Sequence, residues 1–174
     1  MKNKLVLSFV GQDRPGLIQS ITTVITSHEG NWLESHMSQL AGMFAGIVLV
    51  EVEDEKVPGL CQGLAEISGV SVVIEEVVAA GPALRTRLLG LNIVGPDRRG
   101  ILQEVTFELA RNVANIKEME THIAAAPMTG ELTFSADALI EVPDTVDIEH
   151  LGAALDDIAN RLGVDILLEE DVDD

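Results

Sequence analysis

The sequence predicts an α+β protein built from two copies of one βαββαβ unit, and three observations support this prediction. The stretch FVGQDRPGLIQSI, residues 9–21, is closely matched by IVGPDRRGILQEV, residues 93–105. Each stretch is a strand-like run that breaks at a glycine-flanked, charged turn and continues as an apolar helix pattern. The chain of 174 residues is also long enough for two small domains.

The repeat extends well beyond this turn. An offset of 84 residues superposes identical residues along much of both halves without a gap, and this density of identities is improbable by chance. We therefore interpret the halves as two copies of one unit. The identical pairs are Gly11 and Gly95, Asp13 and Asp97, Arg14 and Arg98, Gly16 and Gly100, Gln19 and Gln103, Thr22 and Thr106, Asn31 and Asn115, Glu34 and Glu118, and Gly46 and Gly130.

The apolar patterns of the first copy predict its six elements in order. Gly30 lies where the first helix is expected to stop. Strands are expected at 5–10, 31–41, 47–52 and 70–77, with AGMFAG, residues 41–46, as the turn of a hairpin. The first helix is marked by an apolar face of Leu17, Ile18, Ile21, Val24 and Ile25, and the second by Val57, Leu60, Cys61 and Leu64.

The second copy has the same order of elements. Its first helix is marked by Ile101, Leu102, Val105, Leu109 and Val113, and its second by Ile148, Leu151, Leu155, Ile158 and Leu162. Right-handed crossovers place both helices of a unit on one face of an antiparallel sheet, which is the ferredoxin-like arrangement. We expect domains at 1–79 and 86–174, with a linker at 80–85 in which AAGPAL, residues 79–84, supplies most of the chain.

The other sheet face should be polar if it is solvated, yet the strands GIVLV and VSVVIEEVV are almost continuously apolar. We therefore expect burial of this face against the other copy or a second chain, so a homo-oligomer is one option.

Charge and composition exclude several classes of function. The formal net charge is −18, and aromatic residues make up only 3% of the chain. Such an acidic protein repels nucleic acid, and the RNA-recognition modules that share this topology need aromatic stacking residues on their strands. We therefore expect no direct DNA or RNA binding. The terminal LLEEDVDD is expected to be a solvated tail, with a handle for a basic partner as the alternative.

Motifs for catalysis, metals and membranes are missing from the sequence. The single Cys61 excludes an internal disulfide and is expected to be a small buried helix residue. The four histidines lack metal-ligand spacing, and there is no phosphate-binding P-loop or nucleophile elbow. No apolar run is long enough for a signal peptide or a membrane span. We expect a cytoplasmic protein with no membrane partner, cofactor, metal or catalytic residue.

The repeated turn has two open interpretations. Asp13 and Asp97 can cap the following helices, which would be a purely structural role. The free amides at a helix start also form a natural seat for a carboxylate. Asn31 and Asn115 begin the next strand of each copy, where they either lie near the turn or occupy a left-handed helix stop.

The stretch GQDRPGLIQSITTVITSHEGNWLES resembles the ACT domain signature, in which a G-x-D-R-P-G turn precedes an amphipathic helix and Gly-Asn opens the next strand. Two such domains resemble the glycine cleavage system transcriptional repressor family over nearly the whole chain. The second copy departs from the signature, because Arg99 replaces Pro15 and Pro96 replaces Gln12.

This resemblance implies a set of ligand residues. In ligand-binding ACT domains the turn and the asparagine contact a small amino acid at a domain interface. Some of these domains have a histidine at the position of Gly11, and this chain has none in either copy. The implied ligand-binding residues are Gly11, Gln12, Asp13, Asn31, Gly95, Pro96, Asp97 and Asn115.

The resemblance also implies a function. We expect a non-enzymatic regulator of glycine-cleavage genes that contacts a DNA-binding transcription activator and senses a small amino acid such as glycine. The alternative is an amino-acid-sensing regulator of another pathway or of an enzyme partner. An acylphosphatase-like enzyme would use Arg14 and Asn31 to hold phosphate, but Asp13 beside Arg14 would repel an anionic substrate.

Overall fold

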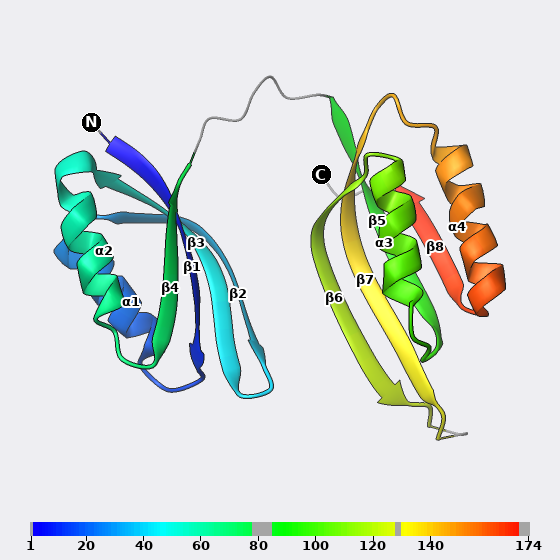
Figure 1. The fold of residues 1–174 in the computed structure, drawn as a ribbon, viewed down its shortest axis with the longest axis horizontal. Helices are drawn as coiled ribbons and strands as arrows, with labels where there is room; N and C mark the ends of the chain where they lie inside the picture. Colours follow the sequence, from blue (N-terminus) through cyan, green and yellow to red (C-terminus); the bar gives the residue numbers. More distant parts are fainter. Residues whose placement is uncertain (1, 78–84, 128–129, 171–174) are drawn as a thin grey trace. The chain divides into compact units, whose positions relative to one another are not determined.

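Two similar units form the protein, and each consists of an antiparallel sheet with two helices on one face (Figure 1). The computed structural model describes residues 2–77, 85–127 and 130–170, and it divides the chain into units of residues 1–81 and 82–174. The predicted fold class is confirmed. The predicted linker, apart from Arg85, and residues 171–174 of the acidic tail lie outside the described residues.

The two units have the same topology. The sheet order is β2-β3-β1-β4 in unit 1 and β6-β7-β5-β8 in unit 2, so the first strand of each unit is a central strand. Unit 1 comprises β1 (Lys2–Gln12), α1 (Leu17–Ser27), β2 (Asn31–Leu40), β3 (Met43–Glu53), a short 3-10 turn (Asp54–Lys56), α2 (Val57–Ala65) and β4 (Val70–Glu76). Unit 2 comprises β5 (Thr86–Pro96), α3 (Ile101–Arg111), β6 (Asn115–Ala125), β7 (Leu132–Pro143), α4 (Ile148–Leu162) and β8 (Asp165–Glu170).

The predicted hairpin turn was too long. Only Ala41 and Gly42 form the turn, and both have positive φ, 50° and 80°. This backbone suits a two-residue hairpin whose twist matches that of its strands. Met43 pairs with Leu40, so the rest of the predicted turn belongs to β3.

Each unit has its own apolar core between helices and sheet. In unit 1 the alternate residues of the central strands meet one face of each helix, as the periodicity predicts. The buried residues include Leu5, Leu7, Ile21, Ile25, Val50, Leu60 and Leu64 in unit 1, and Leu89, Ile93, Val105, Leu109, Ile140, Leu151 and Leu155 in unit 2. Cys61 is only partly buried, although it lies on α2 as expected.

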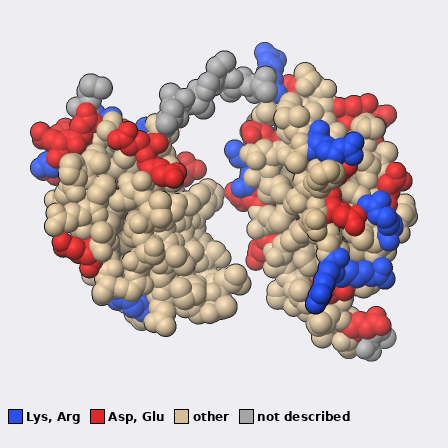
Figure 2. All heavy atoms as spheres, in the orientation of Figure 1, with Lys and Arg blue, Asp and Glu red and all other residues tan. Residues whose placement is uncertain are grey.

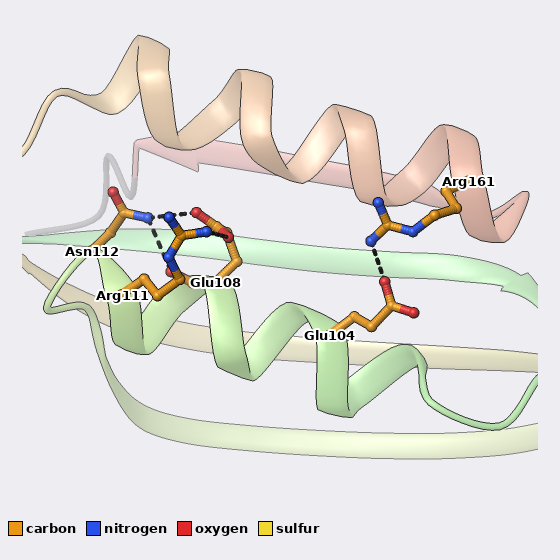
Figure 3. A network of polar contacts seen from close by, with 5 residues as sticks. All are labelled: Glu104, Glu108, Arg111, Asn112 and Arg161. Atoms are coloured by element: carbon orange, nitrogen blue, oxygen red, sulfur yellow. Dashed lines mark hydrogen bonds and ion pairs between the residues drawn. The ribbon is translucent and has the colours of Figure 1, made fainter.

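The two helix pairs are held together differently. In unit 1, Gly59 and Gly63 of α2 leave room for the His28 ring, and a Cβ built on either glycine would lie 3.0 or 3.3 Å from ring atoms. The His28 Nδ1 lies 2.9 Å from the Val24 carbonyl oxygen, which anchors the ring. In unit 2, Arg161 of α4 instead pairs with Glu104 of α3 (Figure 3).

Candidate functional site

The turn before α1 does not contain the predicted aspartate cap. Gly16 occupies the N-cap position with φ 86°, and Gly100 does the same before α3 with φ 96°. Neither helix start has a side-chain cap hydrogen bond, so the prediction that Asp13 and Asp97 cap these helices was wrong. Glycine is favoured at both N-caps because the backbone is left-handed there.

The two aspartates lie instead where the turn meets the neighbouring hairpin. The Asp13 amide donates to the Gly42 carbonyl at 2.9 Å, and the Asp97 amide donates to the Leu132 carbonyl at 2.9 Å. Their exposed side chains are therefore not needed for helix capping. The sequence missed the cap that does exist, since Asp147 accepts a hydrogen bond from the His150 amide at the start of α4.

Gly11 and Gly95 are required by close packing of the sheet. A Cβ on Gly11 would lie 2.7 Å from the carbonyl oxygen of Gly69, just before β4. A Cβ on Gly95 would lie 2.7 Å from Val164, just before β8. Close packing thus explains both glycines, and the same crowding leaves no space for a larger side chain such as histidine.

Arg14 and Arg98 also lie beside the turn that precedes the last strand of their units. The Arg14 guanidinium donates to the Ser68 carbonyl at 3.2 Å. The Arg98 guanidinium lies 3.6 Å from a Cβ built on Gly163, at the equivalent turn of unit 2. Arg14 therefore has a structural partner, although its other guanidinium N–H groups remain available to an anion.

A shallow pocket of about 250 Å³ lies at the start of α1. Its lining includes Asp13, Arg14, Ile18, Gln19 and Phe44. The helical hydrogen bonds begin with the Ser20 amide and the Gly16 carbonyl at 2.9 Å, so the preceding amides of Ile18 and Gln19 are free of the helix ladder. Free amides and a guanidinium are suited to a carboxylate, and the pocket is smaller than those of drug-sized ligands.

Gln12 and Pro96 flank the two turns. Gln12 ends β1 opposite Met43, and Pro96 ends β5 opposite Thr133. Both side chains are exposed and lie beside their turns.

The two asparagines lie far from the turns of their own units. Asn31 is in register with Glu51, which is in register with Lys4 near the start of β1. The path along β1 from Lys4 to Asp13 is about 30 Å at ~3.3 Å per residue. The interpretation that Asn31 approaches the turn within one unit was therefore wrong, and Asn115 is displaced from Asp97 in the same way.

The alternative interpretation of the asparagines was also wrong. The left-handed residues after the first helices are Glu29, with φ 58°, and Val113, with φ 57°. Asn31 and Asn115 are instead the first residues of β2 and β6. Because Arg14 and Asn31 lie at opposite ends of the unit, a phosphate site of the acylphosphatase type is not assembled.

A glutamate faces each asparagine across the sheet. Glu51 pairs with Lys2 at 2.7 Å, and this contact lowers the pKa of Glu51 and raises the pKa of Lys2. Glu141, opposite Asn115, accepts from the Thr86 hydroxyl at 3.1 Å. These pairings depend on strand register, so no pattern in the sequence predicts them.

The described residues contain neither a metal-ligand cluster nor a membrane-spanning helix. Within 2–77, 85–127 and 130–170, no three His, Cys, Asp or Glu side chains are grouped so as to hold a metal ion. No helix in these segments has the length and apolar character needed to cross a bilayer.

Comparisons with known proteins identify the unit. Residues 3–70 match the ACT domain family. The UPF0237 protein of Methanocaldococcus jannaschii is 33% identical over 55 residues, which are 32% of this chain and 61% of that protein. The chain thus spans less than two thirds of that relative.

Two solved structures have the same tandem fold. An unknown protein from Galdieria sulphuraria is 31% identical and has a TM-score of 0.89, covering 99% of this chain and 100% of its own. A candidate glycine cleavage system transcriptional repressor is 15% identical and has a TM-score of 0.68 over 97% of each chain, a likeness of fold. Residues 3–70, which make up most of unit 1, thus match the ACT domain family, and unit 2 repeats the topology of unit 1, so the chain has a tandem ACT-like fold.

Proposed function

We propose that this protein is a non-enzymatic transcriptional regulator that represses glycine-cleavage genes by contacting a DNA-binding activator. The observation that carries the proposal is the tandem fold itself, which a candidate glycine cleavage repressor has over 97% of each chain. The net charge of −18 supports action through a protein partner, because it disfavours contact with DNA phosphates.

The proposed effector is a small amino acid bound at the start of α1. Its carboxylate would accept hydrogen bonds from the free amides of Ile18 and Gln19 and from Arg14. The pocket volume of about 250 Å³ and its Phe44 wall support a ligand of the size of glycine or serine. Unit 2 has Arg99 and Pro96 at the corresponding turn, so we expect the unit 1 site to bind more tightly.

A pull-down with the tagged full chain from native cytosol tests the proposed partner, performed with and without glycine. The proposal is supported if mass spectrometry identifies a LysR-type activator and if the amount recovered changes when glycine is added. Recovery of an amino-acid biosynthetic enzyme instead favours the alternative, a regulator of another pathway or of an enzyme. Gel-shift assays at physiological salt should give no complex with operator DNA unless the activator is added, and a specific shift by this protein alone contradicts the proposal.

Thermal shift and calorimetry with glycine and serine test the effector site. A ligand that binds only the folded protein raises its melting temperature, and we expect Arg14→Gln to weaken binding by about tenfold or more. Asn31→Ala is the informative comparison, because Asn31 lies at the other end of the unit. Unchanged binding by Asn31→Ala means that the turn alone forms the site. Lost binding means that the site is completed by an asparagine from another domain, since Asn31 lies too far from the turn of its own unit. Binding unchanged by Arg14→Gln contradicts the proposed site.

A further inference from the structure

The sheet of unit 1 has an apolar surface on the side opposite its helices. We call this surface the open face of unit 1, and it consists of the even-numbered residues of β1 from Val6 and of β2 from Glu34, with the odd-numbered residues of β3 up to Leu49 and of β4. Val10, Ile47 and Val73 are 43%, 50% and 56% exposed there, although they are large apolar side chains. Contiguous apolar surface of this kind marks an interaction site more often than scattered exposed residues do.

The same face of unit 2 is polar at its centre. In unit 1, Ser8 is flanked by Ile47 and Val73 in register. At the corresponding positions of unit 2, Asn92 is flanked by Asp137 and Leu167, and the Asn92 side-chain amide donates to the Asp137 carboxylate at 2.6 Å. Burying this face therefore costs little free energy in unit 1, whereas in unit 2 it would remove an asparagine and an aspartate from water.

The carboxylates of the open face lie toward one end, whereas His36 lies in the row of Ser8, in register with Ile47. Glu34 and Glu75 belong to the row of Val6, whereas the rows of Ser8 and Val10 carry no carboxylate among the described residues. Figure 2 shows large uncharged areas on the side of unit 1 that faces the viewer. The open face therefore offers a contact area without carboxylates on a protein whose net charge is −18.

We propose that the open face of unit 1 is a dimer interface that binds the same face of a second copy of this chain. Two copies with this charge repel each other in general, so an area without carboxylates is where they can approach. A two-fold axis pairs a surface with itself, and an apolar surface is self-complementary without paired charges. Glu34 and Glu75, at one end of the face, would lie at the rim and remain solvated.

The size of the face predicts a weak dimer. Four strands spaced by about 4.8 Å and four rows of side chains spaced by about 6.7 Å give a face of roughly 500 Å². Two such faces bury about 1,000 Å² in total, which is at the lower end for specific interfaces. We therefore expect a dissociation constant in the micromolar range and tighter association at higher salt, because salt screens the repulsion.

Sedimentation velocity of the full chain between low micromolar and high micromolar concentration tests the proposal. The test variant is Ser8→Asn with Ile47→Asp, which transfers the Asn92–Asp137 pair of unit 2 to the same register positions of unit 1. The fold already accommodates this pair, and denaturation followed by Trp32 fluorescence checks that unit 1 remains folded. The matched control is Asn92→Ser with Asp137→Ile, which alters unit 2 only.

We expect the wild type and the control to dimerise and the test variant to dissociate, with a dissociation constant raised by about a hundredfold or more, because each copy would bury a carboxylate. A wild type that stays monomeric at all concentrations overturns the proposal and leaves the face to a different partner. A dimer that persists in the folded test variant also overturns it, because the interface then lies elsewhere.

Discussion

Replacing Gly11 with alanine should destabilise unit 1 by packing alone. The new Cβ would lie 2.7 Å from the Gly69 carbonyl oxygen and 3.3 Å from a methyl group of Val70. The oxygen is backbone and cannot rotate away, so β1 and β4 must separate locally. Overpacking of this kind costs about 1–3 kcal/mol. Alanine in a strand gains roughly 0.5–1 kcal/mol over glycine, so we expect a net loss of about 1–2 kcal/mol in the free energy of unfolding.

Urea denaturation followed by fluorescence can assign this loss to one unit. Trp32 is the only tryptophan, the chain has no tyrosine, and Trp32 packs against the unit 1 core. Its emission therefore reports the unfolding of unit 1. Gly11→Ala should lower the urea midpoint of the Trp32 transition, whereas Gly95→Ala should affect unit 2 and leave that transition unchanged.

Gly90→Ala is the matched control for the steric argument. Gly90 also lies in a central strand, but a Cβ built there would lie 3.9 Å from the Glu169 carbonyl oxygen, an ordinary contact distance. We expect this variant to stabilise unit 2 by about 0.5–1 kcal/mol, measured by circular dichroism. A Gly11→Ala protein as stable as the wild type would refute the packing explanation and return Gly11 to the candidate ligand residues.

Three further predictions concern helix ends and charge. Asp147→Ala should lower the stability of unit 2 in thermal melts by about 0.5–2 kcal/mol, whereas Asp13→Ala should lose no cap and leave the Trp32 transition near the wild-type midpoint. Val113→Gly should raise the melting temperature of unit 2, because a β-branched residue at φ 57° is strained by roughly 1 kcal/mol. An unchanged melting temperature would mean that Val113 is not strained. Lys2 lowers the pKa of Glu51, so the stabilisation by this exposed pair is present at neutral pH and is lost as pH falls through the folded-state pKa of Glu51. An NMR titration should show that pKa rising toward its ordinary value in Lys2→Met, and an unaltered titration would count against the ion pair.

The fold was predictable because the relevant signals are local and occur twice. Apolar periodicity marked the helices, and the repeated glycine turn fixed where each first helix begins. The errors arose where backbone geometry decided the outcome. Val113 follows the helical spacing, but α3 ends at Arg111 and Val113 is left-handed and 67% exposed.

The candidate site was less predictable, because its residues depend on long-range register. The order of elements allowed Asn31 to be placed near the turn, but α1 carries the chain back to the opposite end of the sheet before β2 begins. The clash that explains Gly11 involves Gly69, far away along the chain. A sequence without an alignment therefore identifies the turn as unusual but does not distinguish packing from ligand contact.

The central position of each unit's first strand has a consequence for synthesis. β1 is made first, but its two neighbours, β3 and β4, end at Glu53 and Glu76, so its pairing depends on distant segments. Folds dominated by such long-range pairs form slowly, and domains emerge from the ribosome in order. Unit 1 can close only after residue 76 has left the exit tunnel, because β4 must pair with β1. Between the synthesis of β1 and that of β4, the apolar β1 lacks its strand partners. A translational pause shortly after β4 would give unit 1 time to fold before β5, a strand of similar pattern, can pair with β3 or β4 in place of β1.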